Sequence, residues 1–239
     1  DLPSTARAKD NRVALLRQLE DYVIPRLSSI DAPLLAVIGG STGAGKSTLV
    51  NSILRREVSK PGVIRPTTTS PVLIHHPRDA HWFTDKRILP GLARVTGDPS
   101  GPDESATVRL VTSEELPPGM ALLDAPDIDS VVSANRSLAR QLLAAADLWL
   151  FLTTAARYAD AVPWELLRQA SDRGTAVAIV LDRVPPEVMG EVRPHLVEML
   201  REQGLGTAPV FPIPEVVLDA GALIPESDIA RLRGWLTDL

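Results

Sequence analysis

The segment LLAVIGGSTGAGKSTLVNSIL, residues 34–54, limits the possible folds of this chain more than any other. An apolar run typical of a buried strand ends in a glycine-rich turn, and a helix-like pattern follows at once. Residues 40–47 match GxxxxGK[ST], a pattern in which backbone N–H groups wrap a phosphate and the lysine supplies a cation. The following helix would point the positive end of its dipole at the same anion. The sequence therefore predicts a strand, a phosphate-binding loop and a helix in succession.

Apolar runs typical of buried strands recur along the chain, with helical patterns between them. They begin near residues 34, 71, 120, 148, 176 and 209, and residues 106–111 predict an extra strand. Near-continuous apolar runs separated by helices favour a mostly parallel sheet that is covered on both faces. We therefore expect a three-layer α/β domain over residues 34–239. Apolar residues at helical spacing within 7–30 predict an N-terminal helical segment, assigned to residues 1–33.

The composition excludes several classes of protein. The 239 residues carry 25 Lys and Arg against 30 Asp and Glu, a net charge of −5, so no nucleic-acid partner is expected. The chain has no cysteine, which excludes disulfides and thiol chemistry and fits a cytoplasmic protein. No apolar stretch approaches the ~20 residues that a membrane-spanning helix needs. A single large domain with a small N-terminal addition is the expected organisation.

Three later segments supply polar side chains where strands are predicted to begin or end. A threonine run, Thr67 to Thr69, precedes the strand near residue 71, and the sequence LLDAPD at 122–127 ends the strand near 120. Asp182 ends the run that begins at residue 176, and Arg183 follows it. Hydroxyl and carboxylate oxygens are the ligands that Mg²⁺ prefers. Within the phosphate loop, the hydroxyl of Ser47 can bind Mg²⁺, so a magnesium ion beside the phosphates is expected.

The phosphate loop alone is as similar to that of an ABC transporter ATPase as to that of a GTPase. An ABC ATPase would need an LSGGQ-like signature, which this chain lacks, and a catalytic Glu where Ala125 stands. The order of the segments instead resembles the G domain of dynamin-like and Era-like GTPases, in particular the bacterial dynamins of the actinobacterial type. This resemblance implies a Ras-like P-loop NTPase fold, GTP and GDP as ligands, and Mg²⁺ as cofactor.

The resemblance also implies a role for each motif residue. Lys46 and Asp124 would be catalytic, as would Thr68, with Thr67 and Thr69 as close alternatives to Thr68. Thr42 joins them, because it holds the loop position at which dynamins carry a water-orienting glutamine. The implied magnesium ligands are Ser47, Thr68 and Asp124. The implied nucleotide-binding residues are Gly40, Ser41, Thr42, Gly43, Ala44, Gly45, Lys46, Ser47, Thr48, Asp127, Asp182 and Arg183.

The chain departs from the family pattern at two boxes. Asp127 stands where the DxxG motif has its glycine, and its carboxylate would repel a phosphate unless it is paired or turned outward. Pro185 stands where the NKxD motif has its guanine-reading carboxylate. Asp182 and Arg183 would then contact the base from a shifted position, or form a strand-end turn without base contact. We expect slow hydrolysis of GTP by the chain alone.

Two alternatives remain open from the sequence. One is a nucleotide-dependent interaction module with little hydrolysis, and the other is an ABC-type ATPase. For a dynamin-like G domain the resemblance implies a nucleotide-dependent homodimer. It also implies a cytoplasmic location, with association at the inner face of the membrane through regions outside this chain.

Overall fold

The computed structural model describes residues 31–59, 70–84, 88–89, 91–97, 107–129 and 133–239. Contacts divide the chain into two compact units, Asp1–Ala32 and Pro33–Leu239. The predicted N-terminal helix falls almost wholly on residues 1–30, outside the described residues, and stays a prediction. The second unit carries the sheet and the phosphate loop, and the following description concerns that unit.

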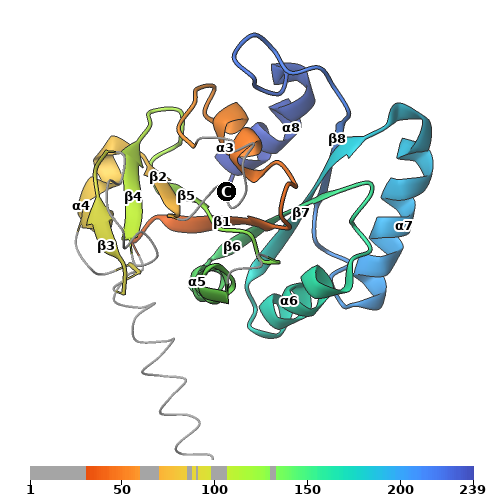
Figure 1. Cartoon of the computed structure of the whole chain (residues 1–239), viewed down its shortest axis with the longest axis horizontal. Helices are drawn as coiled ribbons and strands as arrows, with labels where there is room; N and C mark the ends of the chain where they lie inside the picture. Colours follow the sequence, from red (N-terminus) through yellow and green to blue (C-terminus); the bar gives the residue numbers. More distant parts are fainter. Residues whose placement is uncertain (1–30, 60–69, 85–87, 90, 98–106, 130–132) are drawn as a thin grey trace, which may run out of the picture. The chain divides into compact units, whose positions relative to one another are not determined.

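The second unit is built on one eight-stranded sheet in the order β3-β4-β2-β5-β1-β6-β7-β8 (Figure 1). The strands are β1 (Leu34–Gly40), β2 (Val72–His75), β3 (Ala93–Val95), β4 (Thr107–Thr112), β5 (Met120–Asp124), β6 (Leu148–Thr154), β7 (Ala176–Val184) and β8 (Val210–Pro214). Every neighbouring pair is parallel except β2 and β5. The expected mostly parallel sheet is confirmed, and β4 is the extra strand predicted at 106–111.

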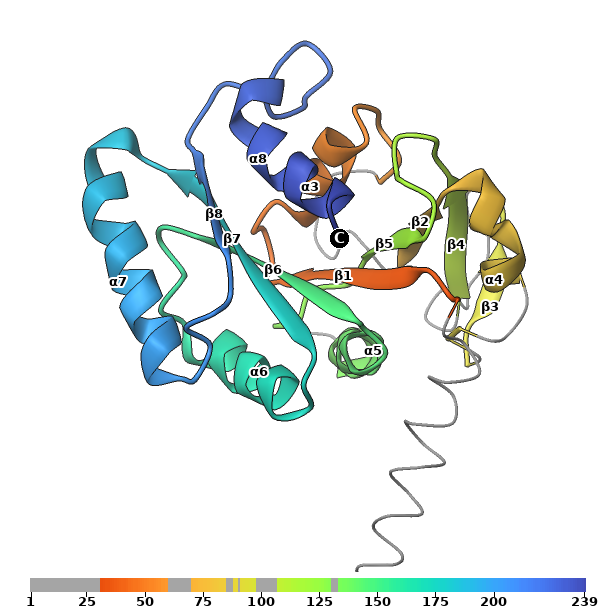
Figure 2. The ribbon, with the colours of Figure 1, turned by 180° about the vertical axis from the view of Figure 1, so that it is seen from behind.

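Helices cover both faces of the sheet (Figures 1 and 2). They are α3 (Lys46–Ile53), α4 (Ala80–Thr84), α5 (Ser133–Ala144), α6 (Ala161–Asp172), α7 (Met189–Glu202) and α8 (Glu226–Thr237), with short 3₁₀ turns at Pro77–Asp79 and Pro186–Val188. Apolar residues of α3 and α8 pack on one face, and those of α4, α5, α6 and α7 pack on the other. The predicted three-layer α/β architecture is therefore confirmed. Within the described residues, no helix has the length and apolar character needed to cross a bilayer.

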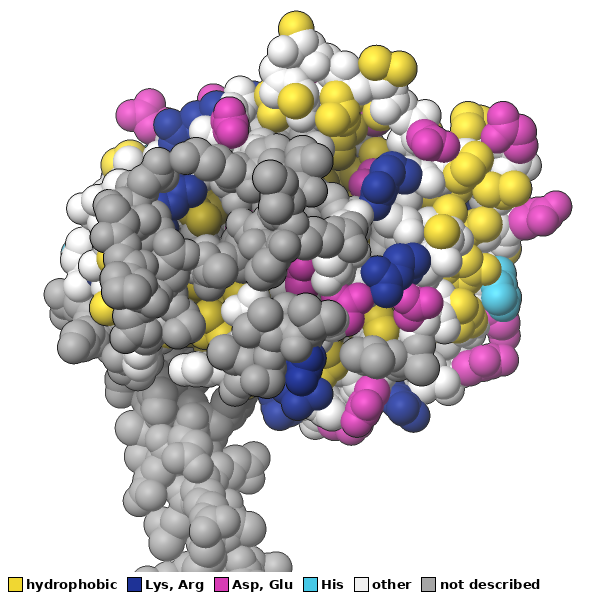
Figure 3. Space-filling model, viewed as in Figure 1, with side chains coloured by type: hydrophobic (Ala, Val, Ile, Leu, Met, Phe, Trp, Pro, Cys, Tyr) yellow, Lys and Arg dark blue, Asp and Glu magenta, His cyan; other side chains and the backbone are white. Residues whose placement is uncertain are grey.

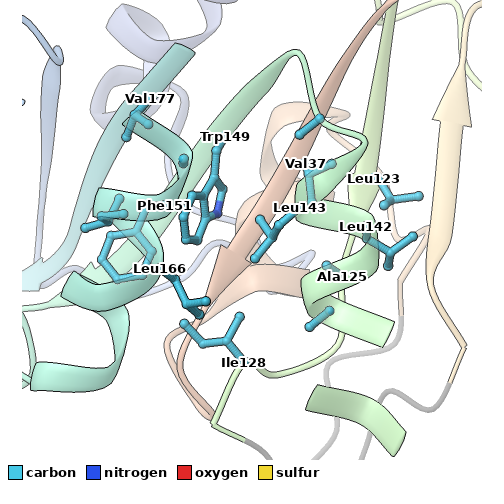
Figure 4. Packing of buried hydrophobic residues seen from close by; sticks show 14 of the residues in the cluster. Val37, Leu123, Ala125, Ile128, Leu142, Leu143, Trp149, Phe151, Leu166 and Val177 are labelled. Atoms are coloured by element: carbon cyan, nitrogen blue, oxygen red, sulfur yellow. The ribbon is translucent and has the colours of Figure 1, made fainter. Parts of the chain in front are cut away.

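The core on the α5 side holds the central strands in place (Figure 4). Trp149 and Phe151 of β6 meet edge to face, with ring centroids 5.7 Å apart and an interplanar angle of 75°. Leu142 of α5 and Leu167 of α6 are almost fully buried in the same cluster. Burying each large apolar side chain contributes about 1.5–3 kcal/mol to folding. The central strands of the sheet, β6 among them, are thus anchored by packing along their length.

The register of the sheet brings four strand ends to one edge. Ile38 of β1 lies opposite Asp124 of β5, and Thr154 of β6 lies opposite Asp182 of β7. The chain leaves β1 through α3 on one face, whereas it leaves β5 through α5 on the other. In open α/β sheets, ligands bind outside the carboxyl ends of the strands where the connections diverge in this way. The candidate site lies at this edge.

Candidate functional site

The loop between β1 and α3 has the backbone shape that its glycines permit. Gly43 and Gly45 have φ of 75° and 99°, which is left-handed backbone that side chains rarely adopt. Gly40 lies so close to β6 that a Cβ there would stand 2.3 Å from the carbonyl oxygen of Leu152. The N–H of Ala44 donates to the carbonyl of Ser41 over 3.1 Å and closes the turn. The loop therefore curls tightly before the helix begins.

Lys46 is the first residue of α3 and its side chain is directed back over the loop. The side chain is only 6% exposed. Its ammonium group donates to the carbonyl oxygens of Gly40 and Ser41 over 2.9 and 3.2 Å. It also forms an ion pair with Oδ1 of Asp127, the residue at the DxxG glycine position. The expected carboxylate next to the phosphate site is therefore paired, and its partner is the phosphate-loop lysine.

Asp124 lies at the end of β5 and joins the loop helix through hydroxyl groups. Its Oδ2 accepts hydrogen bonds from the hydroxyls of Ser47, over 2.8 Å, and Ser59, over 2.6 Å. Its Oδ1 is buried and has no hydrogen-bond partner among the described residues. Burial raises the pKa of Asp124, while the hydrogen bond from Ser59 and the charge of Lys46 act in the opposite direction. A buried carboxylate oxygen without a partner, beside a serine hydroxyl, fits the oxygen ligands of Mg²⁺.

Ser59 is positioned by Asn51 of α3, and neither residue was identified from the sequence. The Asn51 side-chain oxygen accepts from the N–H groups of Val58 and Ser59, both over 2.9 Å, and its amide donates to the carbonyl of Ser59 over 2.7 Å. Asn51 and Ser59 are buried. Neither belongs to a nucleotide-binding pattern, so only the three-dimensional arrangement reveals them.

Thr42 is held by a second carboxylate that the sequence did not identify. Oδ1 of Asp129 accepts from the backbone N–H and the hydroxyl of Thr42, over 2.6 and 2.8 Å. Arg157, from the loop after β6, donates to Oδ2 of Asp129 over 3.0 Å and to the carbonyl of Thr42 over 3.1 Å. Burial opposes ionisation of Asp129, but these hydrogen bonds outweigh it and hold its pKa below the usual value. Three segments thus meet at the third position of the phosphate loop.

Asp182 and Arg183 approach the phosphate loop from β7. Arg183 has φ of 51°, and the β7–β8 register shifts between Leu181 and Val184, so the strand bends here. Its guanidinium donates to the carbonyl of Gly43 over 2.6 Å. Oδ2 of Asp182 lies 3.0 Å from the position that a Cβ on Gly45 would occupy. Both residues lie within β7, which continues to Val184, two residues past the end of the predicted run.

Burial dominates the electrostatics of Asp182. Desolvation raises the pKa of its carboxyl to about 6, although the backbone N–H and the charge of Arg183 favour ionisation. The guanidinium Nε of Arg183 lies 3.5 Å from Oδ2 of Asp182. Side chains of both signs thus border the loop, and Figure 3 shows basic and acidic side chains next to each other near the middle of this view.

Most residues that were predicted from the motifs therefore come together at one edge of the sheet. Residues 40–48 run from the end of β1 through the phosphate loop into α3. Asp124 ends β5 and Asp127 follows it, and Asp182 and Arg183 come from β7. The carbonyl of Thr48 accepts from the hydroxyl of Ser52 within α3 over 2.6 Å. Thr67, Thr68 and Thr69 lie outside the described residues, so their predicted role is an expectation from the sequence alone.

Solved structures that share this fold include a bacterial dynamin, Era and Toc33. A bacterial dynamin from an oligomerised, membrane-tethering pair matches with a TM-score of 0.60 and 14% identity, over 98% of this chain and 42% of that chain. Era from Aquifex aeolicus bound to GDP and AlF4⁻ matches with a TM-score of 0.53 and 20% identity, over 86% of this chain and 56% of that chain. Toc33 from Arabidopsis thaliana, a dimerisation-deficient variant, matches with a TM-score of 0.51 and 14% identity, over 93% of this chain and 89% of that chain. This chain spans about half the length of the Era and bacterial dynamin chains.

The sequence comparison defines the family. A comparison with curated proteins returned no match. The model of the Dynamin family matches residues 35–184, which run from β1 to the end of β7 and include the phosphate loop, Asp124 and Asp182. The chain therefore belongs to the dynamin family and has the Ras-like fold of a P-loop GTPase domain.

Proposed function

We propose that this chain binds GTP and GDP with Mg²⁺ and hydrolyses GTP to GDP and phosphate, slowly when alone. The observation that carries the proposal is the hydrogen bond between Ser47 and Asp124, two predicted magnesium ligands, close enough to Lys46 for its charge to act on Asp124. Support also comes from Era, a structural neighbour that was solved with GDP and AlF4⁻. The family match removes the ABC-type ATPase from the alternatives.

Each group at the site has a part in this proposal. The loop amides and Lys46 hold the phosphates, and the N-terminus of α3 adds its dipole to the same binding site. Ser47 and Asp124 hold Mg²⁺, with Thr68 as the proposed third oxygen ligand. The ion would neutralise charge that develops on the phosphate oxygens. Thr42 and the backbone around it position the attacking water.

Base recognition is assigned to Asp182 and Arg183. Asp182 presents a buried carboxyl group next to Gly45, and a carboxylate accepts two hydrogen bonds from the edge of guanine. The aliphatic part of Arg183 would lie along the base while its guanidinium stays on Gly43. This arrangement replaces the missing carboxylate at Pro185. The proposal therefore includes a preference for guanine over adenine.

A calorimetric titration with GDP, ADP, a non-hydrolysable GTP analogue and the matching ATP analogue, all in Mg²⁺, tests the assignment. We expect guanine nucleotides to bind more tightly than adenine nucleotides. Lys46→Ala should lose at least about tenfold in affinity, because a charge-assisted contact to phosphate contributes about 1.5–3 kcal/mol. Arg201→Ala, which removes an exposed cation from α7, is the matched control. Equal or tighter binding of adenine nucleotides would overturn the base assignment.

A second candidate is a nucleotide-dependent interaction module with little hydrolysis. The observation that favours it is that Lys46 and Thr42 are engaged by the carboxylates of Asp127 and Asp129. A single-turnover assay separates the two functions, because phosphate release faster than in buffer rejects the module. Phosphate release that matches buffer, with nucleotide binding retained, rejects the hydrolase.

The proposed assembly is a homodimer that forms through nucleotide-bound GTPase domains and stimulates hydrolysis. It is motivated by the bacterial dynamin neighbour, which is described as oligomerised, and by Toc33, which is described as a dimerisation-deficient variant. Gel filtration with light scattering, with GDP and then with the GTP analogue, tests it. Association with the inner face of a membrane is proposed only for segments beyond this chain.

A further inference from the structure

Two carboxylates that follow β5 contact the phosphate loop on its cationic and amide groups. Asp127 forms an ion pair with the ammonium of Lys46, and Asp129 accepts from the N–H and hydroxyl of Thr42. Both contacts use groups that, in a phosphate-binding loop, are suited to bind an anion. Residues 127–129 therefore place two carboxylates of the chain itself where the loop would otherwise bind an external anion.

The segment that carries these carboxylates is anchored on both sides. Ile128, which lies between them in the sequence, is 3% exposed and belongs to the apolar core cluster on the α5 side of the sheet. Its N–H donates to the carbonyl of Gly40 over 3.4 Å. Arg157 fixes Asp129 from the loop after β6. Because Asp127 is joined to this anchored segment, separating it from Lys46 would disturb neighbouring contacts as well.

The lysine that Asp127 engages is the group that reaches the outer phosphates of a nucleotide. A triphosphate brings one more phosphate, and hence more negative charge, to the region where the Asp127 carboxylate lies. Like charges placed next to each other are unfavourable by several kcal/mol when they are desolvated. A diphosphate can share Lys46 with Asp127, whereas a triphosphate must displace the carboxylate. The repulsion therefore falls mainly on the triphosphate.

We propose that Asp127 is a specificity-determining residue that competes with the outermost phosphate for Lys46, so that this site holds a nucleoside diphosphate more tightly than the corresponding triphosphate. Asp129 and Arg157 act as positioning residues, because they fix the segment from which Asp127 reaches the lysine. This inference rests on the proposed guanine-nucleotide binding. It adds the discrimination between the two nucleotide states, which the motif residues alone do not define.

The test measures the dissociation constants of GDP and a non-hydrolysable GTP analogue in Mg²⁺, for the unmodified chain, Asp127→Asn and Asp127→Gly. For the unmodified chain we expect weaker binding of the analogue than of GDP. The dissociation constant of the analogue divided by that of GDP should fall at least about fivefold in both variants, because the repulsion acts on the triphosphate. Asp129→Asn should lower the ratio in the same direction and by less. Glu198→Gln, which removes an exposed carboxylate that pairs with Arg201 on α7, should leave it unchanged.

The outcomes separate this inference from the proposed function. If both nucleotides bind and the ratio stays the same in Asp127→Asn and Asp127→Gly, the competition is wrong and nucleotide binding stands. If neither nucleotide binds to any of the proteins, the proposed function fails and this inference fails with it. Thermal unfolding of each variant verifies the fold, and Asp127→Asn keeps the side-chain size should Asp127→Gly prove unstable.

Discussion

The hydroxyl oxygen of Ser47 lies 2.8 Å from Oδ2 of Asp124, although 77 residues separate the two in the chain. Ser47 is the second residue of α3, and Asp124 is the last residue of β5. The parallel pairing of β1 with β5 places Ile38 opposite Asp124 and so brings both residues to the same edge of the sheet. The second carboxylate oxygen of Asp124 is buried without a partner among the described residues. This arrangement is the one expected if both groups bind a single Mg²⁺, as proposed above.

This relationship predicts a shared loss of magnesium dependence in two variants. Ser47→Ala and Asp124→Asn should each reduce the gain in nucleotide affinity that Mg²⁺ provides, because each removes one oxygen ligand or its charge. The double variant should lose less than the sum of the single losses, since both groups serve one ion. Titrations in Mg²⁺ and in EDTA measure the gain. An exposed serine on α8 supplies the control Ser227→Ala, and an undiminished gain in both single variants would contradict the assignment.

Gly40→Ala should destabilise the fold by about 1–3 kcal/mol, as overpacking of a tight contact typically does. The added Cβ would lie 2.3 Å from the Leu152 carbonyl of β6, a backbone atom that cannot move alone. The control is Gly190→Ala near the start of α7, where a Cβ meets nothing within 4 Å. That substitution should stabilise by up to about 1 kcal/mol, because alanine favours helix. Urea unfolding measures both, and equal stabilities would disprove the steric argument.

The sheet and the phosphate loop could be predicted because their signals are local. Residues 148–152 are apolar throughout, and the whole of β6 is buried, so this sequence alone indicates a central strand. Strand β3, with three residues, and helix α4, with five, are short and partly exposed, so hydrophobic periodicity could not reveal them. The apolar run that begins at residue 176 ends at Asp182, whereas β7 continues to Val184 and so includes Arg183.

The contacts around the loop could not be predicted because they join distant segments. Thr42 and Arg157 are 115 residues apart, and no motif spacing relates them. Asp127 was expected to be paired or turned outward, and only the folded chain identifies Lys46 as its partner. Local patterns predict which residues would bind phosphate, whereas long-range packing decides which side chains contact those residues.

The Asp129–Arg157 pair should show a small coupling that depends on pH. Arg157 is 42% exposed, so a double-mutant cycle with Asp129→Asn and Arg157→Gln should give about 1 kcal/mol or less. The pKa of Asp129 is lowered in the folded chain, so its contribution is present above the unfolded pKa of about 3.9. It is lost as the pH falls through the lower folded value. Urea unfolding at pH 7 and pH 3 measures the coupling, and a coupling that grows toward pH 3 would refute this account.

Asp182 should make the fold less stable as the pH rises from about 4 to about 6. Its folded pKa of about 6 exceeds the unfolded value, so the native chain binds this proton more tightly than the unfolded chain does. Ionisation therefore costs more in the native state, and the free energy of unfolding falls by up to about 3 kcal/mol across this range. Other groups that titrate here are common to the unmodified chain and Asp182→Asn, so the difference between the two proteins isolates this carboxyl.

The stability of Asp182→Asn relative to the unmodified chain should thus increase between pH 4 and pH 7, because the amide does not ionise. Urea unfolding of both proteins at several pH values across that interval measures the difference. The charge of Arg183 opposes the burial effect on the Asp182 pKa, so Arg183→Gln should enlarge the loss and extend it to higher pH in the otherwise unmodified chain. A constant difference between Asp182→Asn and the unmodified chain over the whole interval would show that Asp182 is already ionised at pH 4. Its burial next to Gly45 would then not control its charge.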